Sequence, residues 1–316
     1  MRKVKKTESL PLLVLSVYIL LVLTRIIPQQ AFGNTVAIFA AMVILEVMVF
    51  ALPSFTYCRL FALNYVDELK IRLPSVRACL QSAIFCAVII FGSLSINSLV
   101  YLTGFLDEEL FMIGPSVLAN EHAHTQFLYV FFAYALIPAV CEEFLFRGIL
   151  LSGYAGCLHV QKKTQALLFP SILSSLLYAM AGLDFSSFLS RFFTGMMLCF
   201  AVLFTGSLLC AFIIRFACGL LSVYFIPALR NMVTQPLTRA FAFLFIPVAF
   251  LISLFFLLLV LEREYKKRAY DPAYAHSATA SYSTDGNYSF ANAVLSVFFI
   301  ICIVFFVVSG TLGIVL

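Results

Sequence analysis

The chain has 316 residues, of which 63% are hydrophobic and only 11% are charged. No soluble domain of this size has such a composition, so the sequence predicts an integral membrane protein built from transmembrane helices. Its net charge of +5 is explained by basic loops on one side of the membrane, and we expect membrane lipid but no nucleic acid as a partner.

Several apolar stretches are long enough to cross a hydrocarbon core of about 30 Å. They predict an all-α, polytopic transmembrane bundle of about eight or nine spans, because the fifth and sixth stretches are short. The stretches are 10–27, 34–52, 78–102, 126–145, 166–181, 188–204, 207–225, 240–261 and 290–316.

Lysine and arginine cluster before the first stretch and after the second, fourth and eighth. Basic loops remain cytoplasmic, so the amino terminus is expected in the cytoplasm and the carboxyl terminus outside. The clusters consist of Arg2, Lys3, Lys5 and Lys6; Arg59, Lys70, Arg72 and Arg77; Lys162 and Lys163; and Arg263, Lys266, Lys267 and Arg268.

The chain divides into three predicted regions. Residues 1–125 hold the amino-terminal transmembrane helices and an amphipathic helix at 57–73, which is expected to lie in the cytoplasmic interface and to end at Pro74. Residues 126–225 form a core, and residues 226–316 hold the last transmembrane helices with a polar, tyrosine-rich loop at 269–289.

Metal-binding and disulfide patterns are weak. The nine cysteines form no Cys-x-x-Cys or Cys/His cluster, and no glycine-rich nucleotide loop is present, so we expect no metal and no cofactor. The four histidines all fall in predicted loops, where His122 and His124 beside Glu121 read as a solvated loop more readily than as metal ligands; the others are His159 and His276.

Two adjacent carboxylates and an arginine interrupt the apolar run around residue 145. On a helix, Glu143 and Arg147 stand at i,i+4 and can form an ion pair, while Glu142 points about 100° away. Acids this deep in a membrane face the bundle interior and need partners, and a carboxylate there can act as a general base. The alternative is that the three residues only hold neighbouring helices together.

A further carboxylate, Glu46, lies alone in the second apolar stretch. A single acid within a membrane span is a functional candidate by default. It could serve as a proton site or as a partner of Arg215, or it could simply extend its carboxylate to the interface.

From Glu142 onward the sequence resembles the CPBP family, also called Abi. This family includes type II CAAX prenyl endopeptidases and bacteriocin-processing or immunity membrane proteins. The likeness continues through Ser174-Ser175-Leu-Leu-Tyr178-Ala179, Arg191-Phe-Phe-Thr-Gly195 and the stretch Thr205–Gly219, and it covers roughly residues 126–224. The resemblance implies a helical membrane core, and for bacterial members a place in the cytoplasmic membrane.

In active members, as the resemblance implies, the glutamate pair activates a water molecule, and two histidines and an asparagine complete the site. Glu142, Glu143 and Arg147 match the first motif, and Tyr178 matches the aromatic residue of the second. The remaining positions depart from the pattern: Gly182 and Arg215 replace the two histidines, and Gly219 replaces the asparagine.

These departures lead to a hypothesis about how the charges of the site are paired. An arginine cannot lose its proton in a protein, so Arg215 needs a carboxylate partner inside a bundle. We expect Arg215 and Arg147 each to take one of the two glutamates and to form a closed ion-pair cluster.

Three functions remain open from the sequence. We favour a pseudopeptidase, not an enzyme, that binds a membrane protein partner or a prenylated or hydrophobic peptide. The first alternative is an active CAAX-type endopeptidase in which Glu142 or Glu143 activates water while Arg215 and Tyr178 supply oxyanion donors. The second is a subunit of a membrane transport or export complex.

Overall fold

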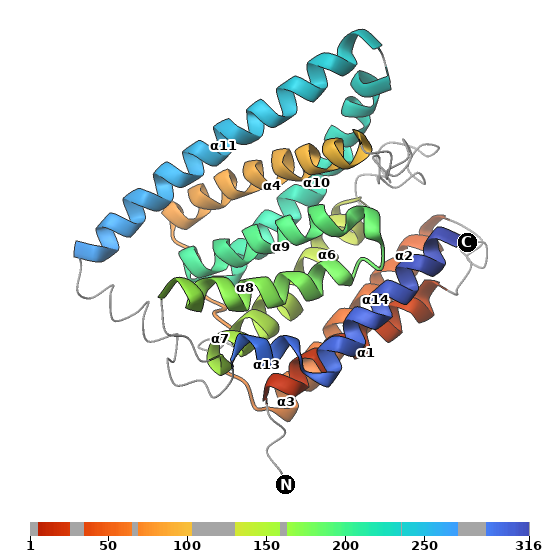
Figure 1. Ribbon diagram of the computed structural model, residues 1–316, viewed down its shortest axis with the longest axis vertical. Helices are drawn as coiled ribbons and strands as arrows, with labels where there is room; N and C mark the ends of the chain where they lie inside the picture. The colour runs from red at the N-terminus through yellow and green to blue at the C-terminus, as the bar shows by residue number, and fades with distance from the viewer. Residues whose placement is uncertain are drawn as a thin grey trace.

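The computed structural model describes residues 6–25, 35–64, 69–102, 130–158, 163–234, 236–270 and 289–315. These residues form α-helices and π-helical segments and no β-strand, which confirms the all-α class (Figure 1). The elements are α1 Lys6–Arg25, α2 Thr35–Glu46, η2 Val47–Ala51, α3 Leu52–Leu60, α4 Val76–Leu102, η5 Val130–Leu136, α6 Ile137–Glu143, η6 Phe144–Leu150, α7 Leu151–Cys157, α8 Lys163–Met180, α9 Phe185–Thr205, α10 Leu208–Thr234, α11 Pro236–Tyr270, α13 Phe290–Val294 and α14 Val297–Val315.

The chain is an integral membrane protein. Among the described residues, four helices are long and apolar enough to cross a membrane: Ala37–Leu60, Val76–Val100, Phe185–Thr205 and Phe243–Glu264. Four further apolar helices are shorter: Glu8–Thr24, Gln165–Met180, Leu208–Ser222 and Val297–Thr311. The prediction of eight or nine spans is therefore confirmed only as four long candidate spans.

Two predicted spans are not continuous apolar helices in the structure. The stretch 126–145 lies partly in a helical rod that also carries Glu142, Glu143 and Arg147. The stretch 290–316 is broken into α13 and α14 by a turn at Leu295, whose backbone N–H bonds the carbonyl of Ala291.

That rod is built from four consecutive elements, η5, α6, η6 and α7, over residues 130–157. Pro138 lies in the first turn of α6, directly after η5. A proline inside a helix lacks an N–H and its ring crowds the carbonyl one turn earlier, which loosens the α-helical ladder at that point. Helical stretches of π type are often found at functional sites.

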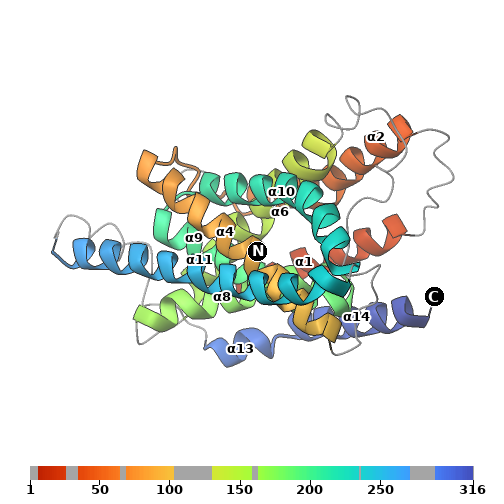
Figure 2. The ribbon, with the colours of Figure 1, turned by 90° about the horizontal axis from the view of Figure 1, so that it is seen from above.

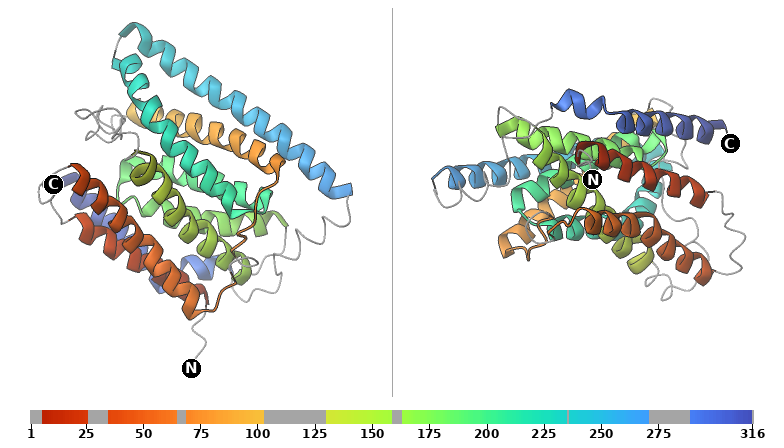
Figure 3. Two further views of the ribbon diagram at one scale, coloured as in Figure 1. Left: turned by 180° about the vertical axis from the view of Figure 1, so that it is seen from behind. Right: turned by 90° about the horizontal axis from the view of Figure 1, so that it is seen from below.

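The bundle places this rod in its interior. The element α6 packs against α10 on one side and against the α2–η2 segment on the other (Figure 3). Helices α8 and α9 form an antiparallel pair, and α4 lies between α9 and the long α11 (Figure 1). The helices α1 and α14, from the two ends of the chain, lie side by side on the opposite flank (Figures 1 and 2).

The start of α9 is fixed by a helix cap. Asp184 accepts hydrogen bonds from the backbone N–H groups of Ser186 at 3.0 Å and Ser187 at 3.2 Å, which satisfies donors that the first helical turn leaves unpaired. At the other end Gly206 adopts a left-handed conformation, with φ of 70°, and its N–H bonds the carbonyl of Val202. These two signals make α9 a helix of defined length within the core.

The predicted amphipathic helix at 57–73 is wrong. The α2–η2–α3 helix ends at Leu60, and the chain turns at Phe61 and Ala62, whose φ is 50°. The segment beyond packs against the beginning of α10, where the N–H of Leu208 donates to the carbonyl of Lys70 at 3.0 Å. Residues 61–64 and 69–73 are therefore not helical, and residues 65–68 lie outside the described part of the chain.

Some predictions fall outside the described residues. These are the loop at 103–125 with His122 and His124, the loop position of His159, and most of the tyrosine-rich loop at 269–289 with His276. The division into regions 1–125, 126–225 and 226–316 stays a prediction.

Candidate active site

The glutamate pair lies where α6 passes into η6. Glu142 and Glu143 are the last two residues of α6, and Arg147 lies within η6, all of whose residues are buried. The rod is held against α8 at this level, because the hydroxyl of Ser174 donates to the carbonyl of Phe146 at 2.7 Å. The three motif residues are thus fixed on a buried element.

Glu143 and Arg147 form the inner ion pair. Nη1 of Arg147 donates to Oε1 of Glu143 at 2.8 Å, and both side chains are fully buried. The guanidinium also stacks on the ring of Tyr178, 4.2 Å from the ring centroid. Three polar atoms of this pair are buried and form no hydrogen bond to a described group. They are Oε2 of Glu143 and the Nε and Nη2 atoms of Arg147.

Glu142 and Arg215 form the outer ion pair, between α6 and α10. Nη2 and Nε of Arg215 both donate to Oε2 of Glu142, at 3.0 and 3.3 Å. The Arg215 side chain is 26% exposed and that of Glu142 is 12% exposed, so this pair can be reached from outside the bundle. The expected pairing, one arginine to each glutamate, is confirmed.

The position of Gly182 shows a feature that the sequence did not predict. A β-carbon built on Gly182 would lie only 2.9 Å from Cδ and from Nε of Arg191. The side chain of Arg191, from α9, therefore lies across the position where active relatives are expected to carry a histidine. No spacing rule relates Arg191 to the glutamate motif, and only the pairing of α8 with α9 brings them together.

Gly219 occupies a close contact between helices. A β-carbon at Gly219 would lie 3.2 Å from Cα and 3.3 Å from Cβ of Ala135 in η5. This is tighter than ordinary van der Waals contact, so α10 and η5 approach each other at a residue without a side chain. An asparagine at this position would require the two elements to separate.

Glu46 belongs to the same charged cluster. It ends α2, and its carboxylate interacts electrostatically with Glu142, Arg215 and Arg191. Its Oε1 atom is buried and bonds no described group. The nearest hydrogen-bonded partner of Arg215 is Glu142, so Glu46 is a second acid near that arginine and not its direct partner.

The cluster therefore contains three acids and three arginines: Glu46, Glu142, Glu143, Arg147, Arg191 and Arg215. Two of the arginines hold a carboxylate directly, and one of these, Arg147, lies over the buried ring of Tyr178. In the described part of the chain, no group of three or more His, Cys, Asp or Glu side chains is arranged to hold a metal ion.

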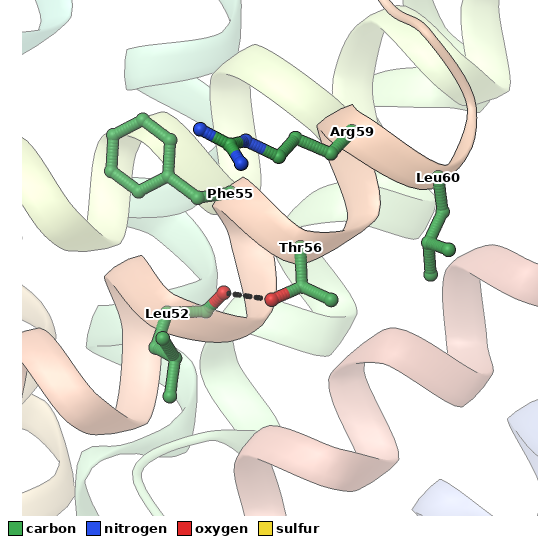
Figure 4. A pocket seen from close by; sticks show the side chains of 5 residues that line it. All are labelled: Leu52, Phe55, Thr56, Arg59 and Leu60. Carbon is green, nitrogen blue, oxygen red and sulfur yellow. Dashed lines mark hydrogen bonds between the residues drawn. The ribbon is translucent and has the colours of Figure 1, made fainter.

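A separate groove of about 560 Å³ lies on the outer face of α3 (Figure 4). One helix face lines it, and the residues are Leu52, Phe55, Thr56, Arg59 and Leu60. Phe55 also contacts Phe144 of η6, with ring centroids 5.2 Å apart. The groove is largely apolar and is separate from the ion pairs, so it adds no chemical group to the site.

Comparison with known proteins matches residues 124–221 to the family described as Type II CAAX prenyl endopeptidase Rce1-like. No curated protein and no solved structure matches the chain. The matched segment contains both ion pairs and Tyr178, Gly182, Arg191 and Gly219. Glu46 is outside it, so the structure draws one acid of the cluster from a different part of the chain.

Proposed function

Because residues 124–221 match the family described as Type II CAAX prenyl endopeptidase Rce1-like, we propose that this integral membrane protein binds a prenylated or hydrophobic peptide, or a membrane protein presenting one, without cleaving it. The observation that carries the proposal is the ion pair between Arg215 and Glu142. Its geometry bears directly on whether a glutamate can activate water.

A general base must hold its accepting atom within hydrogen-bond reach of the proton that it takes. Oε2 of Glu142 instead accepts two N–H groups of Arg215. Oε1 of Glu143 accepts from Arg147, and that side chain is fully buried. One oxygen of each glutamate is therefore engaged by a cation that cannot give up its proton.

The groups expected to stabilise a reaction intermediate also differ from those of an active site. The described residues include no histidine, and Gly182, Arg215 and Gly219 stand at the positions that would supply donors. Loss of a single oxyanion donor typically lowers a rate by about 10²–10³-fold. These substitutions favour a role in which the domain binds its ligand without hydrolysis.

A second candidate is an active endopeptidase, and one observation favours it. The Glu142–Arg215 pair is partly exposed, and Arg215 also interacts electrostatically with Tyr178. A substrate that displaced the guanidinium from Glu142 would release the carboxylate and place a strong donor beside the carbonyl.

The two candidates are separated by comparing the wild type, Glu142→Gln and a full deletion in the native host, with protein abundance matched. Amino termini of all membrane proteins are profiled in each strain. The exposed Glu8 provides a control, as Glu8→Gln changes an acid outside the cluster. Glu142→Gln is expected to give the wild-type profile while the deletion retains a phenotype; accumulation of uncut substrates in both strains would establish the endopeptidase instead.

A further inference from the structure

We propose that the groove on the outer face of α3 binds an anionic phospholipid, whose headgroup is held by Arg59 and whose acyl chain lies against the apolar lining residues. The groove has a volume of about 560 Å³, within the range of about 300–1,000 Å³ that is typical of ligand sites. It is separate from the two ion pairs, so this inference does not depend on the proposed binding of a peptide.

The groove lies at the end of a candidate membrane span, where lipid headgroups meet the hydrocarbon core. The span covers Ala37–Leu60, so Arg59 is its second-last residue and Leu52 lies two helical turns deeper. Both side chains are exposed on the outside of the bundle, which in a membrane is the surface that lipids cover. The order of charged and apolar groups along the groove therefore matches that of a phospholipid, with its phosphate at the interface and its chains below.

The lining residues offer one charged group beside an apolar surface. Thr56 donates its hydroxyl to the carbonyl of Leu52 at 2.8 Å, so this polar group is satisfied within the helix. The ring of Phe55 contacts Phe144 of η6, which holds one wall of the groove in place. Figure 4 shows the Arg59 side chain directed back along α3 toward Phe55, so the guanidinium borders the apolar part of the groove.

The charge of Arg59 favours an anionic ligand. Its guanidinium forms no ion pair with any described residue, and positions 55–63 of the sequence contain no acidic residue. A guanidinium can bind a phosphate through two parallel N–H···O bonds, and basic residues at a membrane surface attract anionic lipids. An anionic headgroup therefore complements this groove better than a zwitterionic headgroup, which carries no net charge.

Arg77 provides a matched comparison at the end of another span. It is the second residue of the span Val76–Val100 and is exposed, as Arg59 is in its own span. It does not line the groove of α3. Removing the charge of Arg77 should therefore leave lipid binding in the groove unchanged, whereas removing the charge of Arg59 should weaken it.

The chain contains no tryptophan, so a single introduced tryptophan can report on one site. Leu52→Trp places this reporter in the groove, and Val304→Trp places it on α14, where residues 289–316 contain no basic side chain. The two replaced residues are similarly exposed, at 56% and 55%. Each full-length variant is reconstituted into bilayers of phosphatidylcholine and phosphatidylglycerol, with brominated chains on one lipid or the other. Quenching of the tryptophan by bromine then gives the relative binding of the two lipids at that position.

At Leu52→Trp, phosphatidylglycerol is expected to bind about fivefold more tightly than phosphatidylcholine, because its headgroup is anionic. At Val304→Trp the two lipids should bind equally. Combined with Leu52→Trp, Arg59→Gln should remove the preference and Arg59→Lys should keep part of it, since lysine retains the charge but not the planar fork of donors. Arg77→Gln should keep all of it.

Thr56→Phe tests the groove itself, because the added ring occupies the space of the acyl chain and should reduce the preference. Thermal unfolding shows that each variant is folded. Equal binding of the two lipids at Leu52→Trp, or a preference that survives Arg59→Gln or Thr56→Phe unchanged, would overturn the site. An equal loss with Arg77→Gln would also overturn it, because the preference would then belong to the general charge of the surface.

Discussion

Gly195 of α9 lies directly against Ser175 of α8, with no space for a side chain between the two helices. A β-carbon built on Gly195 would be 2.9 Å from Cβ and 3.1 Å from the backbone Cα of Ser175. Since Tyr178 follows Ser175 by one turn, this contact also fixes the helix that carries the aromatic residue of the site. The close approach has a direct consequence for stability.

Gly195→Ala should destabilise the protein by about 1–3 kcal/mol, because a backbone atom of α8 cannot move aside as a flexible side chain could. Gly156→Ala is the matched control: nothing lies within 4 Å of a β-carbon at that helical position, and alanine favours helix. Unfolding of the two variants in detergent measures the difference. Equal stability of the two would show that α8 and α9 can separate at this contact without cost.

The two ion pairs should differ in how much they stabilise the fold. Arg147→Leu leaves the fully buried Glu143 without its partner and is expected to cost about 3–5 kcal/mol. Arg215→Leu should cost about 1.5–3 kcal/mol, because Glu142 is partly exposed and can recover hydrogen bonds from outside the bundle.

Equilibrium unfolding of both arginine variants in detergent provides the comparison. The double variant Glu143→Leu/Arg147→Leu should recover part of the stability lost in Arg147→Leu, since no unpaired charge then remains in the core. A smaller effect of Arg147→Leu than of Arg215→Leu would contradict the burial that distinguishes the two pairs.

Tyr178 should show two separable contributions. Tyr178→Phe keeps the ring beneath the Arg147 guanidinium, so stability should change by less than about 0.5 kcal/mol. Tyr178→Leu removes the ring and should cost about 0.5–2 kcal/mol from the lost cation–π contact alone, in addition to lost packing. Both variants are compared by thermal unfolding, and an equal loss in each would assign the stabilising contribution to the hydroxyl.

The cap of α9 should make stability depend on pH. Burial acts to raise the pKa of Asp184, but hydrogen bonds from Ser186 and Ser187 outweigh it and hold the pKa below its usual value. A carboxyl with a lowered folded-state pKa contributes stability above its unfolded pKa of about 3.9, and this contribution disappears as the pH falls through the folded pKa.

Unfolding measured between pH 7 and pH 2.5 should therefore show a loss that Asp184→Asn, which keeps a capping oxygen but cannot titrate, does not share. Asp184→Ala should cost about 0.5–2 kcal/mol at neutral pH, because the first-turn donors lose their acceptor. Identical pH profiles for the wild type and Asp184→Asn would show that this carboxyl is not linked to folding.

Local signals in the sequence predicted much of this site. The apolar composition predicted the membrane class, the i,i+4 spacing predicted the Glu143–Arg147 pair, and the permanent charge of Arg215 predicted its bond to Glu142. The two pairings follow from one requirement, that a buried charge needs a partner, and this requirement does not depend on the rest of the fold.

The parts that were missed depend on long-range packing. Arg191 reaches Gly182 only because α8 and α9 pair antiparallel. The sequence offered Glu46 as one possible partner of Arg215, but only the packing of the α2–η2 segment on α6 brings Glu46 to the cluster, and the direct partner of Arg215 is Glu142. The false amphipathic helix at 57–73 had a convincing local pattern. In the structure the helix ends at Leu60, and the carbonyl of Lys70 instead accepts a hydrogen bond from the N–H of Leu208 at the start of α10.

The origin of Glu46 outside the 124–221 segment limits how this protein could be recombined with relatives. A chimera joined anywhere between α2 and η5 would inherit the three arginines and two of the acids from one parent and the third acid from the other. Such hybrids should fold poorly unless the donor also carries an acid at the position of Glu46. Hybrids that take Glu46 and the segment 124–221 from the same parent are expected to fold.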